Sequence, residues 1–321
     1  MLSQGAGGNT SLKEENTLWV KASGRWLKHA QESDIFVPMD LGGVRRLIDA
    51  GSDEGIAGLS LAPDSPLRPS IETTLHALMP QRVVLHCHSI RTLAFAARMD
   101  ARARLDERLD GLNWAFVPYR RPGMPLTLVI RDLLQDAVPD VLVLGNHGLV
   151  VAGEEFEDAE ALLEEVESRL DAPTRESGAP RLDLLSEIAH GTPYRMPSFE
   201  VVHGLATNHD AIRVASKGSL YPDHVVFLGR GAARIGTRAE LDALVENGVL
   251  PGLVLVEGFG ALVRSNLSVN AEEMVRALAL VVEKVDADAA LKYLTLEEEG
   301  ELLCWDAEKY RQSLQTENRK N

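Results

Sequence analysis

Short apolar runs and longer amphipathic stretches alternate along the first half of the chain. Apolar runs bounded by Gly, Pro or charged residues are typical of strands, whereas apolar residues that recur every three or four positions are typical of helices. After a turn-rich opening up to Gly8, the pattern predicts strands at 17–21, 35–37, 83–88, 141–145 and 149–153. It predicts helices at 42–50, 70–78 and 90–99.

A further helix is predicted after residue 153, and a linker follows it. The apolar residues of this helix recur at steps of three, four and seven and share one face: Phe156, Ala159, Leu162, Leu163, Val166 and Leu170. The segment 171–181 concentrates Pro, Gly, Ser and charged residues, which is typical of a linker. Since 321 residues exceed the roughly 100 to 200 of an ordinary domain, we expect two domains, at 1–172 and 173–321.

The second half repeats parts of the first-half pattern. The stretch that starts at Val141 can be laid without gaps on the one that starts at Leu253, and both predict strand, Gly turn, strand and helix. The stretch that starts at Pro80 likewise resembles the one that starts at Pro222. In these superpositions His86, His88 and His147 fall on Leu228, Arg230 and Phe259. A degenerate repeat and a chance likeness between strand-turn-helix units both fit this pattern.

Charge and hydropathy exclude several classes of protein. The chain has 33 Lys and Arg against 48 Asp and Glu, a net charge of -15, whereas nucleic-acid binding requires a basic face. No run approaches the roughly 18 apolar residues of a membrane span, and the N-terminus lacks the basic and then apolar order of a signal peptide. We therefore expect a cytoplasmic globular protein that binds neither nucleic acid nor membranes.

Histidines are the candidate metal ligands. Cys87 and Cys304 form no CxxC pair, which indicates neither a disulfide framework nor a thiolate zinc site. A strand has a side-chain period of two, so His86 and His88 project to one face, close enough to share a cation. His147, in a Gly-flanked turn between two apolar strands, could supply a third nitrogen. Three histidines with an open fourth position are typical of catalytic zinc, although any one histidine alone fits a hydrogen-bonded core residue.

Glu72 lies where a helix is expected to start. Ser70 is a favoured N-cap residue, and a carboxylate in the first turn is stabilised by the helix dipole. A second interpretation is a base beside the cation, which removes a proton from a carbon whose anion the metal stabilises. His76 lies four residues further on the same helix face, and we expect it outside the ligand set because a fourth imidazole would close the site.

Two glycine-containing loops are candidate anion sites. The segment 5–11, GAGGNTS, exposes backbone N–H groups and ends in Asn and hydroxyl residues, although a flexible chain start fits it as well. The segment 21–24, KASG, could add further donors and a positive charge. With Ser70 at a helix N-terminus, these segments could converge on one phosphate or carboxylate.

A set of motifs resembles the class II aldolase/adducin family, which includes fuculose-phosphate and rhamnulose-phosphate aldolases. The motifs are, in order, GAGGNTS, WVKASG, PSIETTLH, HCH, VPYRRPG and LGNHGLVVAG, and they cover about residues 5 to 170. The resemblance implies an α/β fold with three α/β/α layers and a central mixed, mainly antiparallel sheet. A smaller C-terminal α/β domain is expected to follow.

The resemblance also implies roles for individual residues. His86, His88 and His147 match the metal ligands of the aldolases, with zinc as the expected ion and manganese or cobalt as alternatives. Glu72 matches their catalytic glutamate, and Tyr119 matches a tyrosine that acts as acid or base across a subunit interface. In the family that sharing goes with a cyclic tetramer, so a homo-oligomer is implied. The loops that hold the substrate phosphate match Gly8, Asn9, Thr10, Ser23, Gly24 and Ser70.

One position departs from the family pattern. Ile71 stands where the aldolases have a second Ser before the glutamate, which removes a donor to the phosphate. Lys21 or Arg68 could compensate, or the substrate could lack a phosphate.

The resemblance predicts a metal-dependent lyase of carbohydrate metabolism that cleaves a ketose or ketose 1-phosphate by a retro-aldol reaction. The same scaffold in the family also carries pentulose-phosphate 4-epimerases, sugar-phosphate dehydratases and decarboxylases, and the motifs do not choose among them. A different class is a structural module such as adducin, which keeps the fold without the metal ligands. The three histidines and Glu72 favour an enzyme over such a module.

Overall fold

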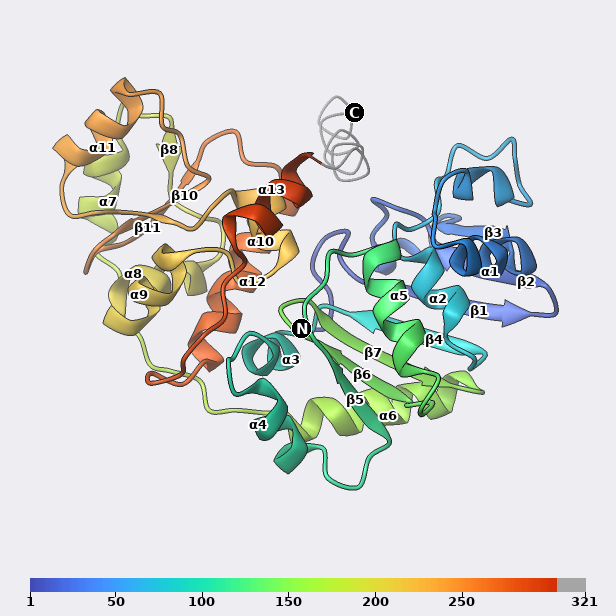
Figure 1. Ribbon diagram of the computed structural model, residues 1–321. Coiled ribbons are helices and arrows are strands. Elements are labelled where there is room, and N and C mark those ends of the chain that lie inside the picture. The colour runs from blue at the N-terminus through green and yellow to red at the C-terminus, as the bar shows by residue number, and fades with distance from the viewer. Residues whose placement is uncertain (305–321) are drawn as a thin grey trace. The chain divides into compact units, whose positions relative to one another are not determined.

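The structure, a computed structural model, describes residues 1–304 and divides into two compact units. Unit 1 comprises Met1–Ala96 and Asp100–Asp171. Among the described residues, unit 2 comprises Ala97–Met99 and residues 172–304. Each unit has a sheet of its own (Figure 1). Within residues 1–304, no helix combines the length and apolar character needed to cross a membrane.

Unit 1 is built on a seven-stranded sheet in the order β3-β2-β1-β4-β7-β6-β5. Neighbouring strands are antiparallel except β5 and β6, which are parallel. The strands are β1 (Asn9–Glu14), β2 (Thr17–Lys21), β3 (Phe36–Asp40), β4 (Val83–Cys87), β5 (Trp114–Val117), β6 (Val141–Leu144) and β7 (Gly148–Gly153). The sheet is therefore mixed and mainly antiparallel, as the sequence predicts.

Helices lie on both faces of this sheet (Figure 1). One face carries α1 (Leu41–Ala50), α2 (Thr73–Leu78) and α5 (Met124–Leu133), and the other carries α3 (Ile90–Ala96) and α6 (Phe156–Arg169). The remaining helical segments of unit 1 are η1 (Leu27–His29), η2 (Ile56–Leu59) and α4 (Ala101–Arg108). Under α2 and α5, apolar side chains of helix and sheet form one core: Leu75, Met79, Leu126, Ile130, Val84, Leu142 and Val150. The predicted three-layer α/β/α fold is confirmed.

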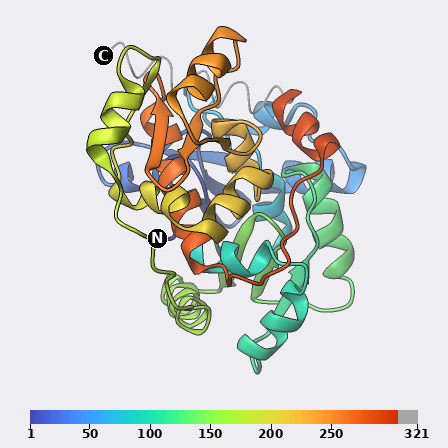
Figure 2. The same ribbon diagram turned by 90° about the vertical axis from the view of Figure 1, so that its left-hand side faces the viewer.

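Unit 2 has a four-stranded sheet in the order β8-β11-β10-β9. Its strands are β8 (Tyr194–Arg195), β9 (Ala233–Ile235), β10 (Leu253–Val256) and β11 (Gly260–Arg264). Its helices are α7 (Leu182–Ala189), η3 (Glu200–His203), α8 (Gly204–Thr207), α9 (His209–Lys217), α10 (Pro222–Leu228), α11 (Arg238–Glu246), α12 (Val269–Lys284) and α13 (Leu296–Cys304). Figures 1 and 2 both show α7 beside the β10–β11 hairpin, which it contacts. A second α/β region is thus present, as expected.

The strand order of unit 2 repeats that of one side of unit 1. The order β4-β7-β6-β5 corresponds to β8-β11-β10-β9, with two antiparallel pairs followed by one parallel pair in each case. In the superposition that places Val141 on Leu253, β6 falls on β10 and β7 falls on β11. These correspondences support a duplication, which stays a prediction.

The second sequence superposition, which places Pro80 over Pro222, does not correspond to a repeat in the structure. Val83–Cys87 forms strand β4, whereas Pro222–Leu228 forms helix α10. Proline suits the first turn of a helix, where its missing N–H has no partner to lose. In the sheet of unit 2 the place of β4 is taken by β8 instead.

Several element boundaries differ from those that the pattern predicts. The pattern does not predict strand β1, because its sequence NTSLKE offers little apolar alternation. The helix expected from residue 70 begins at Thr73, and the helix expected up to residue 99 ends at Ala96. Strand β4 ends at Cys87, so His88 follows the strand directly.

Strand β1 also carries a buried lysine. Lys13 donates to the backbone oxygen of Gln81, with a distance of 2.7 Å between the nitrogen and the oxygen. Burial, with a smaller effect of the nearby Arg45 charge, lowers the pKa of Lys13 to about 7. Between pH 7 and 10.5 the folded chain has released a proton that the unfolded chain still holds. Stability therefore rises with pH across this window.

Lys13→Met is expected to remove this pH dependence. Below pH 7 the wild-type chain buries a charged ammonium, so the variant should be more stable there, and its advantage should shrink toward pH 10. The change scales as about 1.4 kcal/mol for each unit by which the pKa differs between folded and unfolded chains. Urea unfolding at pH 6, 8 and 10 measures it, with the exposed Lys28→Met as control. A difference that stays constant from pH 6 to 10 would contradict this account.

Candidate metal centre

Strand β4 places two histidines at the same edge of the sheet. His86 pairs with Asn9 of β1 and Val150 of β7, and its side chain lies on the sheet face that α2 and α5 cover. His88 comes two residues later, just beyond the strand. The Nε2 atoms of His86 and His88 are 3.2 Å apart, and their ring centroids are 5.0 Å apart. The period of two thus brings the imidazoles together, as the HxH motif predicts.

The turn between β6 and β7 brings the third histidine to the same point. Asn146 has a left-handed backbone with φ of 53°, which Asn tolerates better than most residues. A Cβ atom on Gly148 would lie 2.4 Å from the Cys87 carbonyl oxygen, so only glycine lets the turn approach β4 this closely. The His147 ring centroid lies 5.0 Å from that of His86 and 5.2 Å from that of His88.

The donor set fits a transition-metal ion. One ring nitrogen from each of His86, His88 and His147 lies within 4.8 Å of the others. The Nδ1 atom of His86 lies 3.0 Å from the Leu149 carbonyl oxygen, to which it donates, so its Nε2 lone pair is directed toward the other two rings. Ligands about 2.0–2.1 Å from zinc are about 3.3 Å apart in a tetrahedron, which matches the 3.2 Å between the two Nε2 atoms.

Cys87 lies between the two strand histidines but is not a candidate ligand. Its side chain points to the opposite face of β4, because successive residues alternate. Burial, with help from the Glu167 charge, raises the pKa of the Cys87 thiol to about 12, so it stays protonated. The structure therefore offers nitrogen and oxygen ligands at this point, as the sequence predicts.

Glu72 places a carboxylate against two of the three imidazoles. Its Oε2 lies 3.3 Å from Nε2 of His86, and its Oε1 lies 3.4 Å from Nε2 of His147. Burial alone would raise the pKa of Glu72, but the neighbouring histidines outweigh it and hold that pKa well below its usual range. The group is thus an ionised carboxylate inside the protein.

The helix start differs from the predicted capping. Glu72 itself occupies the N-cap position of α2, and Ser70 lies two residues before it. The Ser70 hydroxyl oxygen accepts from the Glu72 backbone N–H at 3.2 Å, and also from the Asn9 side chain at 3.0 Å. Ser70 therefore lies beside the candidate site without capping the helix.

Two of the segments predicted to bind phosphate, the KASG loop and the segment before Ser70, are connected by a backbone hydrogen bond. Ser23 donates its N–H to the Arg68 carbonyl at 2.9 Å, which places the KASG loop beside the segment entering Ser70. Gly24 and Gly8 have φ of 74° and 66°, a region that favours glycine. On Gly8 a Cβ would lie 2.8 Å from the His86 carbonyl oxygen.

Thr10, one of the residues predicted to hold a phosphate, lies on the opposite sheet face from the histidine cluster. It is paired with Leu85 on β4, whereas Asn9 is paired with His86, so the two neighbouring side chains lie on opposite faces of the sheet. Thr10 lines a groove of about 860 Å³ together with Leu12 and Leu85. Its side chain therefore does not join the histidine cluster.

Tyr119 lies in the loop between β5 and α5, near the turn that carries His147. A Cβ atom on Gly145 would lie 3.1 Å from the Tyr119 backbone nitrogen. Only 3% of the Tyr119 surface is exposed, so within one chain its hydroxyl is not displayed toward a neighbouring subunit. A role across a subunit interface stays a prediction.

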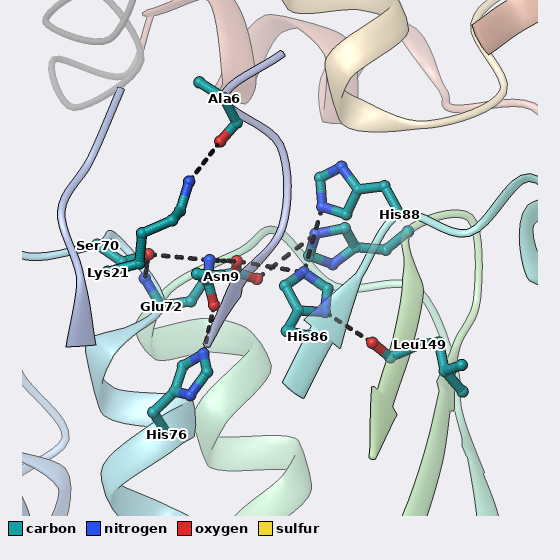
Figure 3. A network of polar contacts seen from close by, with 10 residues as sticks. Ala6, Asn9, Lys21, Ser70, Glu72, His76, His86, His88 and Leu149 are labelled. Carbon is teal, nitrogen blue, oxygen red and sulfur yellow. Dashed lines mark hydrogen bonds and ion pairs between the residues drawn. The ribbon is translucent and has the colours of Figure 1, made fainter. Parts of the chain in front are cut away.

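Sequence reasoning assigned Asn9 to the substrate phosphate and missed its contact with Glu72, and it also missed the carbonyl group that orients His86. Asn9 donates to Oε2 of Glu72 at 2.9 Å, and the Leu149 carbonyl fixes the His86 ring (Figure 3). A backbone carbonyl leaves no trace in sequence. The polar residues Asn9 and Ser11, two apart on what proves to be a strand, are a signal that could have indicated a polar face.

Comparison with known proteins gives related sequences and structures. Residues 1–172 match the family described as the class II aldolase and adducin N-terminal domain. A Bacillus subtilis (strain 168) protein named "Uncharacterized oxidoreductase YuxG" is 31% identical over 166 residues, which are 47% of this chain and 24% of that relative. An L-fuculose phosphate aldolase of Methanococcus maripaludis is 25% identical over 163 residues, 48% of this chain and 77% of the relative.

Among solved structures, the N-terminal class II aldolase domain of a conserved protein from Thermoplasma acidophilum is similar to this chain. It is 26% identical, with a TM-score of 0.45, and the match covers 51% of this chain and 82% of that structure. The L-fuculose-1-phosphate aldolase from Thermus thermophilus is 15% identical, with a TM-score of 0.36, over 53% of this chain and 82% of that one.

Gly148→Ala tests the close approach of the His147 turn to β4. The added methyl group collides with the Cys87 carbonyl, so the free energy of unfolding should fall by about 1–3 kcal/mol. Gly58→Ala is the matched control, because its new methyl group meets nothing within 4 Å. Urea unfolding measures both, and equal stability of the two variants would contradict the packing described here.

Zinc added to metal-free protein is expected to raise the midpoint of thermal unfolding. An ion that binds only the folded chain stabilises it by about 2.7 kcal/mol at a hundredfold excess over Kd. His88→Ala should abolish the shift, whereas the exposed His190→Ala should keep it. Elemental analysis after zinc supplementation provides the second measurement, and protein without bound transition metal would contradict the site.

Proposed function

Because the chain belongs to the class II aldolase/adducin family, we propose that it is a metal-dependent aldolase that cleaves a ketose or ketose 1-phosphate. The observation that carries the proposal is the buried Glu72 carboxylate, 3.3 and 3.4 Å from two histidines of a three-histidine cluster. A structural module has no use for such a cluster, whose burial has to be compensated by hydrogen bonds and charge.

His86, His88 and His147 would hold the ion, with zinc favoured and manganese or cobalt as alternatives. When bound there, the ion supplies a Lewis acid for a carbonyl oxygen and for the negative charge that develops beside it. The His86 ring is already oriented for this purpose by the Leu149 carbonyl.

Glu72 would move the proton at the carbon of the ketone half. In the cleavage direction its carboxyl group gives a proton to that carbon after the carbon-carbon bond breaks, and in the synthetic direction the carboxylate removes it. The low pKa of Glu72 keeps it ionised and ready to accept a proton in the synthetic direction. In the cleavage direction Glu72 must first take up a proton, and the one that the aldehyde-side hydroxyl group of the substrate loses balances the one that the carbon gains. Because it is buried, few water molecules compete with the substrate carbon.

Tyr119 would exchange the proton on the aldehyde-side oxygen. This role requires its hydroxyl, buried in the single chain, to reach the substrate in the assembled protein. We therefore include a homo-oligomer, a tetramer by family resemblance, in the proposal.

The substrate would lie against Gly8, Asn9, Ser23, Gly24 and Ser70. Relatives named as L-fuculose phosphate aldolases support a phosphorylated sugar. Ile71 supplies no hydroxyl group here, and the Lys21 ammonium already donates to the backbone oxygens of Ala6 and Arg25 at 3.0 and 2.6 Å. We therefore expect this chain to bind the substrate phosphate more weakly than the aldolases do. Free ketoses belong among the substrates to be tested.

We assign the proposed chemistry to residues 1–172, in a cytoplasmic enzyme of carbohydrate metabolism, and leave residues 173–321 as a separate domain. An epimerase, dehydratase or decarboxylase of sugar phosphates would use the same cluster and base, and the identity of the product distinguishes them. The oxidoreductase name of the Bacillus relative describes a protein of which only 24% is matched, so it is not transferred.

Incubation of the zinc-loaded protein with ketose 1-phosphates and free ketoses should release an aldehyde and, from a 1-phosphate, dihydroxyacetone phosphate. Glu72→Gln should lower kcat about 100-fold or more, because it removes the group that transfers the proton. His147→Ala should abolish activity, while the exposed Glu157→Gln should leave it unchanged. Aldol product formed undiminished by Glu72→Gln or His147→Ala would contradict the assigned roles, and an epimer alone would favour the alternative reaction.

A further inference from the structure

His76 connects helix α2 to the carboxylate of the candidate site without touching the histidine cluster. It is fully buried, and both of its ring nitrogens have partners on β1. Nδ1 lies 2.7 Å from the Ser11 hydroxyl, and Nε2 is in short contact with Oδ1 of Asn9. Figure 3 shows His76 below Asn9, on the side away from His86 and His88.

The partners of His76 determine its tautomer. Burial lowers the pKa of His76 to about 3, so the ring is neutral and carries one proton. An amide oxygen can only accept, so the proton lies on Nε2 and is donated to Oδ1 of Asn9. The remaining lone pair on Nδ1 then accepts from the Ser11 hydroxyl.

The Glu72 carboxylate requires the NH2 end of the Asn9 amide to face it, and the hydrogen bond from His76 holds the amide in that orientation from the other end. With Oδ1 turned toward His76, the NH2 group donates to the Ser70 hydroxyl at 3.0 Å and to Oε2 of Glu72 at 2.9 Å. A half-turn of the amide would place Oδ1 against the carboxylate and the NH2 group against the N–H of His76. The contact between Oδ1 and the carboxylate would be repulsive in either tautomer of His76, and the buried carboxylate oxygen would lose its donor.

We propose that His76 is a positioning residue that locks the Asn9 amide and, through it, holds the Glu72 carboxylate in place. The proposal rests on Glu72 acting as the base of the proposed reaction. Glu72 faces two histidines on one side, and the Asn9 NH2 group fixes Oε2 on the other. A carboxylate held from both sides has little freedom to turn away from the substrate carbon.

Two substitutions at His76 separate this role from simple packing. His76→Leu keeps much of the buried volume but removes the donor, whereas His76→Gln can still present an N–H group to Oδ1 of Asn9. We expect kcat to fall about 10- to 100-fold in His76→Leu, the range seen when groups that orient site residues are removed. His76→Gln should recover most of the loss. The matched control is Thr74→Val on the same helix, which breaks a buried 2.7 Å contact with Thr127 that does not lead to Glu72.

NMR measurements on the parent protein and on the two variants test the proposal without an assay of enzyme activity. Nitrogen-15 NMR of histidine-labelled protein should show His76 protonated at Nε2 and unprotonated at Nδ1, both with and without zinc. The Asn9 side-chain NH2 protons should exchange slowly with solvent in the parent and in His76→Gln, and faster in His76→Leu.

The outcomes distinguish failure of this inference from failure of the proposed function. His76 protonated at Nδ1, or full kcat in a folded His76→Leu, would overturn the positioning role. Equal loss of kcat in His76→Leu and Thr74→Val would also overturn it, because packing alone would then explain the effect. The expected tautomer and amide protection in a protein without aldolase activity would leave the positioning of Glu72 supported and the reaction wrong.

Discussion

The candidate site depends on the antiparallel pairing of β4 with β7. This pairing sets His86 beside Val150 and brings the Gly148 turn onto the Cys87 carbonyl, so that a histidine distant in sequence meets the HxH motif. A shift of one residue in register would turn His86 to the opposite face of the sheet. Because both strands are buried on both faces, the apolar neighbours that determine this register also determine the geometry of the cluster.

Charge compensation explains why a buried carboxylate is tolerated at this point. Glu72 is 4% exposed and lies among imidazoles that are neutral ligands when they bind a metal and cations when they bind a proton. A bound metal ion or bound protons would supply the positive charge that balances the carboxylate, so metal binding would be coupled to proton release at this cluster. Asn9 contributes a neutral donor that stabilises the ionised form in both states. The polar shell around the ligands therefore matters as much as the ligands themselves.

The sequence predicts those features of the fold and site that depend on neighbouring residues, and not those that depend on packing between distant elements. The convergence of His86 and His88 is indicated by their spacing of two, although His88 lies just beyond the end of β4, and the tight turn at His147 is marked by its flanking glycines. The opposite orientation of Thr10 could not be predicted, because β1 is held in the sheet by its neighbours β2 and β4 and not by an apolar pattern of its own. The same limit applies to Pro222–Leu228, whose apolar run fits a buried strand and a short helix equally well until its packing against α12 is known.

Unit 2 shows that this strand arrangement does not require the cluster. Gly260 corresponds to Gly148 when β7 is laid on β11, yet a Cβ on it would meet Leu185 and His203 in place of a β4 backbone. Phe259 stands at the position of His147, and the register of β8 against β11 places Met196 where His86 would be. The frame of strands and turn is thus compatible with an apolar site as well as with a metal site. The chemistry proposed for this chain therefore belongs to the side chains that unit 1 adds to the frame, and the frame itself implies no reaction for unit 2.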